Sequence, residues 1–96
     1  MSSSRREVDS VGLPDRAIHV VERLLDGELV LYDPKRQRVH ALNSTAAFVW
    51  RACDGRSSLA DIAESLARRY PDDRQAILED VPQIIARFGA EGLLKP

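Results

Sequence analysis

Three side chains in this sequence belong to types that bind metals or act as nucleophiles, namely His19, His40 and Cys53. The two histidines fall in different extended segments, and neither has an acidic or thiol partner at ligand spacing. A zinc site made of these three residues is conceivable, but structural zinc takes four protein ligands and catalytic zinc takes three with a water molecule. Cys53 falls on the apolar side of an expected helix, where a cysteine usually packs as a small core residue. We therefore expect no metal, no cofactor and no catalytic centre.

The remaining candidates for chemistry have simpler explanations. The sequence contains no glycine-rich phosphate loop and no strand–Gly-x-Gly–helix unit. Asp72 and Asp73 stand at the start of an expected helix, where carboxylates interact favourably with the helix dipole. Trp50 is more often a core anchor than a platform on which a ligand stacks. Function must then come from a surface and from the elements that shape it.

Residues 17–43 predict three short strands. Asp26-Gly27 separates two apolar runs, a strong hairpin signal because Gly adopts the positive φ of a type I′ turn. Pro34 cannot donate to a ladder, so the second strand must end near Asp33. The expected strands form an antiparallel meander and cover residues 17–25, 28–32 and 38–42.

Residues 44–94 predict three helices. Asn43 or Ser44 can cap the first helix, and Ser58 with Asp61 resembles a capping box at the start of the second. Pro82 lies inside the third helix and should kink it, because proline removes one intrahelical hydrogen bond. The expected helices cover about residues 44–53, 59–70 and 72–90. The fold class is therefore expected to be α+β and winged-helix-like, with a three-stranded meander followed by three helices.

The composition is that of one globular domain. The 96 residues are 44% hydrophobic and 30% charged, with a net charge of −1. This balance argues against a multidomain enzyme and against a general nucleic-acid or anionic-membrane binder. With one cysteine and no apolar run approaching about 18 residues, a cytoplasmic protein is expected. The polar segment 1–16 is expected to be a flexible tail, and residues 17–96 to be the domain.

The order of strands and helices also fits a winged-helix DNA-binding regulator, because such folds place one helix in the major groove. Residues 72–91 carry five acidic residues and only two arginines, Arg74 and Arg87, and this charge would be repelled by phosphate. DNA binding therefore stands as the alternative function. A small dimerising domain without a ligand is a third interpretation.

Two surface features suggest a partner. The third strand, residues 38–42, is short and has an open edge, which is a template for another strand. The third helix carries Leu78, Pro82 and Gly89 beside Ile85, which is more apolar surface than one core face requires. A wide core face or a dimer contact explains this surplus as well as a groove for an extended peptide does. The residues alone leave these interpretations balanced.

A longer pattern runs in one unbroken order through residues 28–94. The residues that carry it are Gly27 to Asp33, Val39 to Asn43, Ala46 to Trp50, Asp54-Gly55, Leu59 to Ala63, Leu66, Tyr70, Asp80-Val81 and Glu91 to Leu94. This pattern resembles the PqqD-like family, named for the pyrroloquinoline quinone synthesis protein D. The same module is the leader-recognition element of ribosomally made, modified peptides. The sequence departs from the family pattern at Pro82.

The resemblance implies a winged-helix-like module without catalytic activity, and the charge balance already argues against nucleic acid or a membrane as a partner. It implies that the protein binds the leader segment of a precursor peptide between the third strand and the third helix. The peptide would then be presented to a radical SAM enzyme or, in lasso-peptide systems, to a leader peptidase. The peptide-binding positions mapped onto this sequence are Val39, His40 and Ala41 on the strand and Leu78, Val81, Pro82 and Ile85 on the helix.

Overall fold

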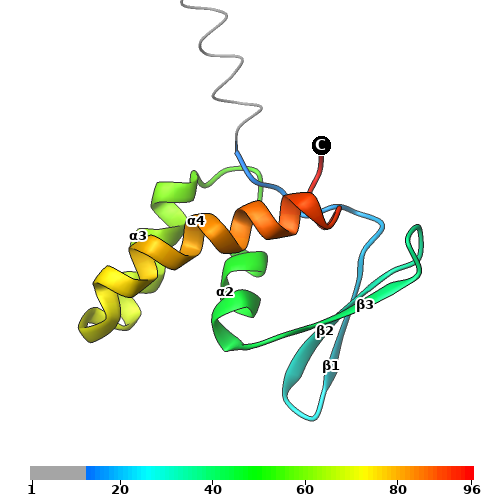
Figure 1. Ribbon diagram of the computed structural model, residues 1–96, viewed down its shortest axis with the longest axis horizontal. Coiled ribbons are helices and arrows are strands. Elements are labelled where there is room, and N and C mark those ends of the chain that lie inside the picture. The colour runs from blue at the N-terminus through cyan, green and yellow to red at the C-terminus, as the bar shows by residue number, and fades with distance from the viewer. Residues whose placement is uncertain (1–12) are drawn as a thin grey trace, which may run out of the picture.

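Three strands followed by helices make up residues 13–96, the part of the chain that the computed structural model describes (Figure 1). The strands are β1 (Val21–Leu25), β2 (Glu28–Asp33) and β3 (Arg38–Leu42). The helices are α2 (Ser44–Ala52), α3 (Leu59–Arg69) and α4 (Arg74–Ala90), with one short 3₁₀ helix, η1 (Pro71–Asp73), before α4. The expected α+β, winged-helix-like class is confirmed.

The sheet is an antiparallel meander in the order β1-β2-β3, so that β1 and β3 are its edges. The β1–β2 hairpin turns through Asp26 and Gly27, whose φ angles of 54° and 83° suit the expected type I′ turn. β1 begins at Val21 and not at residue 17. The reason is that Ala17 donates its backbone N–H to the carbonyl of Leu93 at 3.1 Å, and so pairs with the C-terminal segment.

Side-chain caps fix where α2 and α3 begin. Asn43 accepts the backbone N–H of Ala46 at 2.8 Å, and Ser58 forms the expected capping box with Asp61. The third helical segment begins with η1, so α4 itself starts at Arg74 and then runs unbroken through Pro82 for 17 residues. The Asn43 cap starts α2 directly after β3. Helix α4 then runs alongside the strand in the opposite direction (Figure 1).

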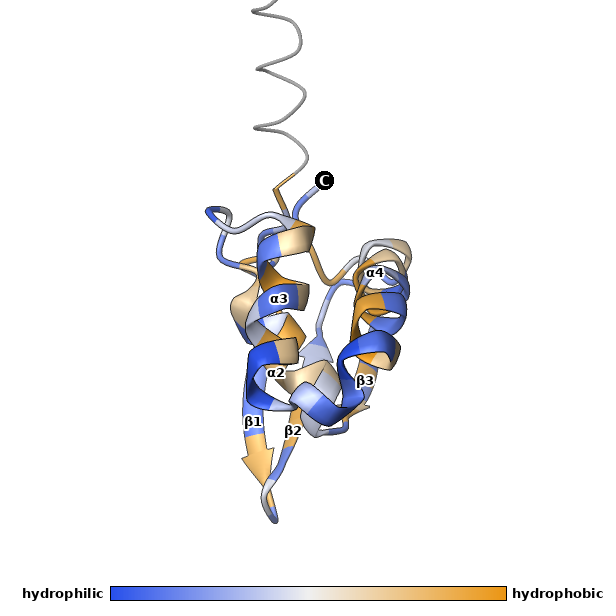
Figure 2. Cartoon of the chain, turned by 90° about the vertical axis from the view of Figure 1, so that its left-hand side faces the viewer, coloured by the Kyte–Doolittle hydropathy of each residue, from blue (hydrophilic) through white to orange (hydrophobic). Residues whose placement is uncertain are grey.

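The core lies between one face of the sheet and the three helices. Its largest fully buried side chains, each at most 2% exposed, are Trp50, Leu31, Ile62, Leu66 and Leu93. Hydrophobic and hydrophilic segments alternate along the helices, and the β1–β2 hairpin projects from the body, with a hydrophobic end of β1 just before a hydrophilic turn (Figure 2). Within residues 13–96, none of the helices is long and apolar enough to cross a membrane.

The first described residues pack against the body of the domain. Pro14 accepts the backbone N–H of Gly55 at 2.9 Å, and Arg16 donates to the carbonyl of Cys53 at 3.0 Å. Arg16 also pairs with Leu94 in an antiparallel bridge. Residues 14–16 were expected to belong to the flexible tail, and these bonds place them in the domain instead. Residues 1–12, the rest of the expected tail, lie outside the described residues.

Candidate functional site

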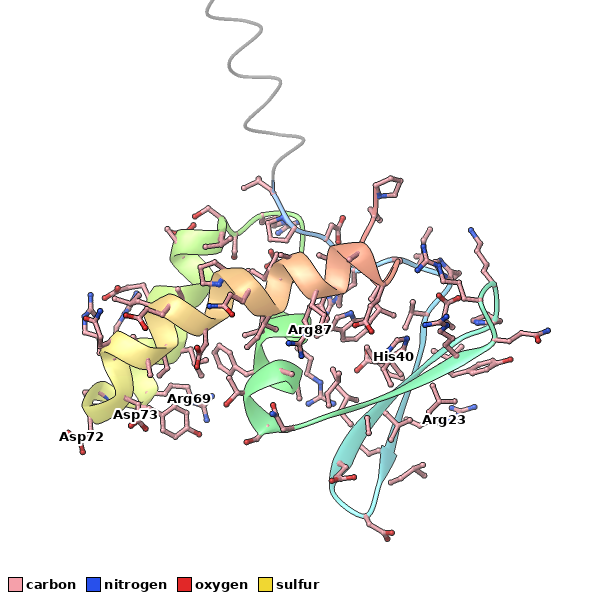
Figure 3. All side chains as sticks on the ribbon, in the orientation of Figure 1. Arg23, His40, Arg69, Asp72, Asp73 and Arg87 are labelled. Atoms are coloured by element: carbon pink, nitrogen blue, oxygen red, sulfur yellow. The ribbon has the colours of Figure 1, made fainter. Side chains whose placement is uncertain are left out.

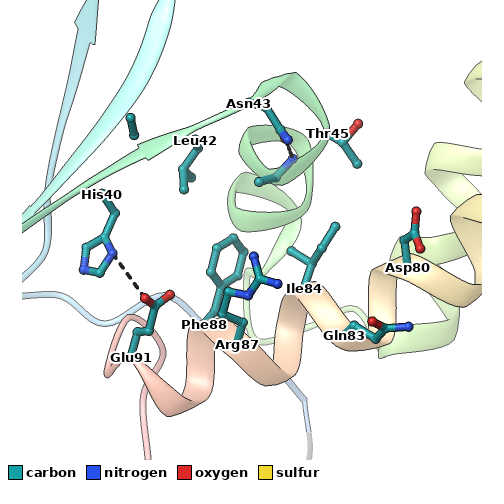
Figure 4. A pocket seen from close by; sticks show the side chains of 12 residues that line it. His40, Leu42, Asn43, Thr45, Asp80, Gln83, Ile84, Arg87, Phe88 and Glu91 are labelled. Atoms are coloured by element: carbon teal, nitrogen blue, oxygen red, sulfur yellow. Dashed lines mark hydrogen bonds and ion pairs between the residues drawn. The ribbon is translucent and has the colours of Figure 1, made fainter.

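A cleft of about 470 Å³ lies between β3 and α4, bounded at one end by the start of α2 (Figure 4). The Cα atoms of β3 and α4 stay more than 8 Å apart, so the helix covers the strand without closing on it. The lining residues are His40, Ala41 and Leu42 from β3, Asn43, Thr45 and Ala46 around the start of α2, and Asp80, Gln83, Ile84, Arg87, Phe88 and Glu91 from α4 and its end.

The floor of the cleft is apolar and its rim is charged. Leu42 and Phe88 are 9% and 3% exposed, and Ile84 is half-buried against the core. Asp80 and Arg87, which line the cleft from α4, are both exposed. A surface with a buried apolar floor and a polar rim has the composition of a recognition site rather than of a reaction centre.

The open edge of β3 forms the second wall of this site. Along an antiparallel ladder, residue pairs that exchange backbone hydrogen bonds alternate with pairs that do not. The pair that flanks a two-residue hairpin turn is of the hydrogen-bonded kind, so the pairs can be assigned outward from the turn. With the observed register, the backbone of His40 is bonded to β2. Val39 and Ala41 therefore direct their N–H and C=O groups away from β2, to the side where residues 13–96 supply no further strand.

A contact between a histidine and a glutamate closes one end of the cleft. His40 Nδ1 lies 3.6 Å from Glu91 Oε2, so the pair joins β3 to the residue that caps α4. The His40 side chain is 12% exposed and that of Glu91 is 35% exposed. The other ring nitrogen of His40, Nε2, is buried and has no hydrogen-bond partner in the described part of the chain.

A buried carboxylate sets the turn that leads into β3. Asp33, 1% exposed, accepts the backbone N–H groups of Lys35 at 2.9 Å and Arg36 at 3.2 Å, and lies 3.2 Å from His19 Nε2. Burial alone would raise the pKa of Asp33, but the two backbone N–H groups and the charges of His19 and Arg36 outweigh it. The pKa therefore lies below its ordinary value of 3.8. This turn holds β3 in register on β2, and so fixes which backbone groups reach the open edge.

The three strand positions expected to bind a peptide all lie at this site. His40 and Ala41 line the cleft. Val39 is 67% exposed, and its backbone faces the open edge although its side chain does not line the cleft.

The four helix positions expected at the site do not line the cleft. Val81 is fully buried in the core, whereas Leu78, Pro82 and Ile85 lie on the flank of α4 away from β3. At about 100° per residue, these three stand on one side of the buried stripe of the helix. The residues that line the cleft stand on the other side. The flank of α4 that faces the strand is therefore not the one that the sequence predicted.

Sequence reasoning missed the flank formed by Asp80, Ile84, Arg87 and Glu91. These residues recur at i, i+4, i+7 and i+11, the same spacing as the flank Leu78, Pro82, Ile85 and Gly89. The signal that separates the two flanks is charge, because a groove that stays open to water keeps a polar rim.

Cys53 is a core residue, as its position in the sequence predicted. Its Sγ lies 3.2 Å from the carbonyl of Val49, to which it donates, and burial raises the pKa of the thiol to about 11. A thiol with so high a pKa is not a nucleophile near neutral pH. Among residues 13–96, no three His, Cys, Asp or Glu side chains come together as a metal site.

The sequence of this chain matches a known family over the segment that forms β2, β3 and all three helices. The family described as coenzyme PQQ synthesis protein D (PqqD) matches residues 28–94. The chain belongs to the PqqD family. This PqqD-family chain is also 34% identical over 58 residues to the "PqqA binding protein" of Bradyrhizobium diazoefficiens. The match covers 60% of the chain and 56% of that relative, so the chain spans little more than half of the relative's length.

Two solved structures have the same fold as this PqqD-family chain. One is TbiB1 in complex with the TbiA(beta) leader peptide, with a TM-score of 0.72 and 18% identity over 84% of this chain and 94% of that one. The other is lasso peptide synthetase B1 complexed with the leader peptide, with a TM-score of 0.74 and 23% identity over 88% of this chain and 99% of that one. At these identities the two structures establish the fold.

Proposed function

We propose that this chain is a non-catalytic adaptor that binds the leader segment of a ribosomally made precursor peptide. The observation that carries the proposal is the open edge of β3 beside a cleft with an apolar floor. An extended peptide can use both features at once, because main-chain hydrogen bonds to a strand edge supply affinity while side-chain pockets supply specificity.

The comparisons support a peptide as the ligand. The relative from Bradyrhizobium diazoefficiens is named a PqqA binding protein, and both solved structures are complexes with a leader peptide. The charge of the cleft is also less suited to DNA, because Asp80 and Glu91 line it and would repel phosphate.

In the proposed complex the leader adds to β3 as an antiparallel strand. The backbone groups of Val39 and Ala41 bond to it, and His40 remains bonded to β2. Alternate side chains of an added strand point to one face of the sheet. Every second residue of the leader would thus meet Ile84 and Phe88 on the floor of the cleft.

The adaptor would then present the bound peptide to a modifying enzyme. The family resemblance favours a radical SAM enzyme or a leader peptidase for this role. Cytoplasmic localisation follows from this proposal, because ribosomally made precursors are produced there.

Two adjacent isoleucines provide a matched test of the site. Ile84 lines the cleft and Ile85 stands on the opposite flank of α4, yet both are half-buried against the core. A labelled leader peptide, taken from a short precursor encoded beside this chain, would be titrated against wild type, Ile84→Asp and Ile85→Asp. Burial of a leucine-sized group is worth about 1.5–3 kcal/mol, so Ile84→Asp should weaken binding by about tenfold or more.

Ile85→Asp should bind the leader as wild type does, and circular dichroism would verify that both variants are folded. If folded Ile84→Asp retains full affinity, the peptide does not use this cleft. If Ile85→Asp alone loses affinity, the peptide uses the opposite flank, as the sequence first indicated.

A further inference from the structure

Arg87 is an exposed cation at the rim of the cleft, without a partner among residues 13–96. Its side chain makes no hydrogen bond or ion pair with any residue in 13–96, although it lines the same cleft as Asp80 and Glu91. Figure 4 shows Arg87 reaching from α4 beside Phe88, whose ring forms part of the apolar floor. A guanidinium in this position can pair with a ligand without first breaking an existing bond.

The two carboxylates on the same side of α4 leave Arg87 free. Glu91, four residues further on, is directed to His40 at 3.6 Å. Asp80, two turns before Arg87, lies at the other end of the cleft and makes no ion pair within residues 13–96. Counting only contacts within residues 13–96, the cleft therefore presents an unpaired cation near its middle, an unpaired anion at one end and an anion in contact with His40 at the other.

The geometry points to a charge requirement in the peptide that this cleft accepts, an inference that rests on the proposed function. The bound segment carries an Asp or Glu side chain that pairs with Arg87, while its neighbouring apolar side chains cover Ile84 and Phe88. A guanidinium can bind a carboxylate with two parallel hydrogen bonds. Arg87 is exposed at the rim of the cleft, so this pair contributes mainly to the choice between acidic and basic peptides.

The position of Asp80 predicts the order of the charged residues along the peptide. Asp80 and Arg87 are seven residues apart on α4, a rise of about 10 Å, which about three residues of extended chain span. A peptide antiparallel to β3 runs in the same direction as α4, because β3 and α4 run in opposite directions (Figure 4). Such a peptide reaches Asp80 before Arg87. It should therefore carry Lys or Arg two to four residues before its acidic residue.

The test uses a display library of randomised twelve-residue peptides, selected in parallel on the full-length wild type, Arg87→Glu and Arg23→Glu. Arg23 is an exposed residue of β1, the edge strand away from the cleft, so its variant has the same change of net charge without touching the site (Figure 3). Circular dichroism verifies the folding of each variant, and Arg87→Gln replaces Arg87→Glu if the reversal unfolds the chain.

Wild type and Arg23→Glu should enrich Asp or Glu at one position by about threefold or more, with a basic residue before it. Arg87→Glu should lose this preference and select Lys or Arg at that position, and Arg87→Gln should select neither charge. In one enriched peptide, replacement of the acidic residue by its amide should weaken binding to wild type by about fivefold and leave binding to Arg87→Gln unchanged.

Failure of this inference is distinguishable from failure of the proposed function. If wild type enriches apolar peptides that no longer bind Ile84→Asp but shows no acidic position, or if the preference survives in Arg87→Glu, the charge requirement is wrong and the groove assignment stands. If the basic residue follows the acidic one, the assigned direction is wrong. If wild type enriches no peptide, or only peptides that bind Ile84→Asp equally well, the proposed function itself fails.

Discussion

His40 of β3 and Glu91 at the end of α4 meet across one end of the cleft, with Nδ1 and Oε2 3.6 Å apart. The contact links two elements whose Cα atoms otherwise remain more than 8 Å apart. The cleft is therefore held by one side-chain pair at this end and by the β3–α2 connection at the other. The width of the cleft between these ends is therefore set before any peptide binds.

Replacement of His40 by leucine should not destabilise the domain. Nε2 of His40 is buried without a partner among residues 13–96, a state that costs free energy, and the 3.6 Å contact of Nδ1 with Glu91 is too long for a strong hydrogen bond. We expect the free energy of unfolding of His40→Leu to equal or exceed that of wild type, whereas His40→Ala should lose about 1 kcal/mol or more. Urea denaturation measures both. A loss of more than about 2 kcal/mol in His40→Leu would mean that Nε2 is satisfied in solution.

Strand addition predicts an alternating pattern of amide protection along β3. The amides of Val39 and Ala41 face the open edge, whereas the amide of His40 is already bonded to β2. Addition of a leader peptide should slow hydrogen exchange at Val39 and Ala41 by about tenfold or more, and should change His40 much less. Amide exchange followed by NMR measures all three. Equal slowing at every residue of β3 would indicate global stabilisation instead of an added strand.

Trp50 should carry a large share of the stability. Its side chain is 2% exposed in the core, and the guanidinium of Arg16 lies 5.6 Å from its ring centroid. Trp50→Ala should cost about 3–5 kcal/mol, which is a substantial fraction of the stability of a small domain. Thermal unfolding measures the loss. Ile18→Ala is the control, because Ile18 is 89% exposed and its truncation should cost less than about 0.5 kcal/mol.

Asp33 should make the domain sensitive to acid. A carboxyl whose pKa is lower in the folded chain than in the unfolded chain stabilises the fold above its ordinary pKa of 3.8, and this contribution is lost as the pH falls below that value. Asp33→Asn should be less stable than wild type at neutral pH, and the difference should shrink towards pH 3. Urea denaturation across this range measures it. Asp26→Asn serves as the control, because Asp26 is exposed in the hairpin turn.

Local signals predicted most of the fold. Asp26-Gly27 fixed the hairpin because its two positive φ angles are demanded by the turn itself, and Ser58 with Asp61 fixed the start of α3 through bonds three residues apart. Such interactions depend only on neighbouring residues, so a sequence carries them explicitly. The start of β1 was predicted too early, because Ala17 is bonded to Leu93, a partner near the other end of the chain.

The lining of the cleft was predicted only on its strand side. The edge of β3 follows from the order of the strands, whereas the rotation of α4 follows from packing against α2 and α3. Ile84 and Ile85 have the same side chain and stand on opposite sides of the buried stripe. An apolar pattern identifies the buried stripe but not which flank beside it faces the sheet. The charges of Asp80 and Arg87 are the local feature that separates the two flanks.

The pairing of residues 15–17 with the C-terminal segment brings the two ends of the described chain to one place on the surface. Asp15 accepts the backbone N–H of Lys95 at 2.8 Å, so a polypeptide that enters the domain there also leaves it there. A domain with such neighbouring ends can be inserted into a surface loop of a larger protein without stretching either junction. Its ends can also be joined by a short linker and the chain reopened at the Asp26-Gly27 turn, which would give a circular permutant with the cleft intact.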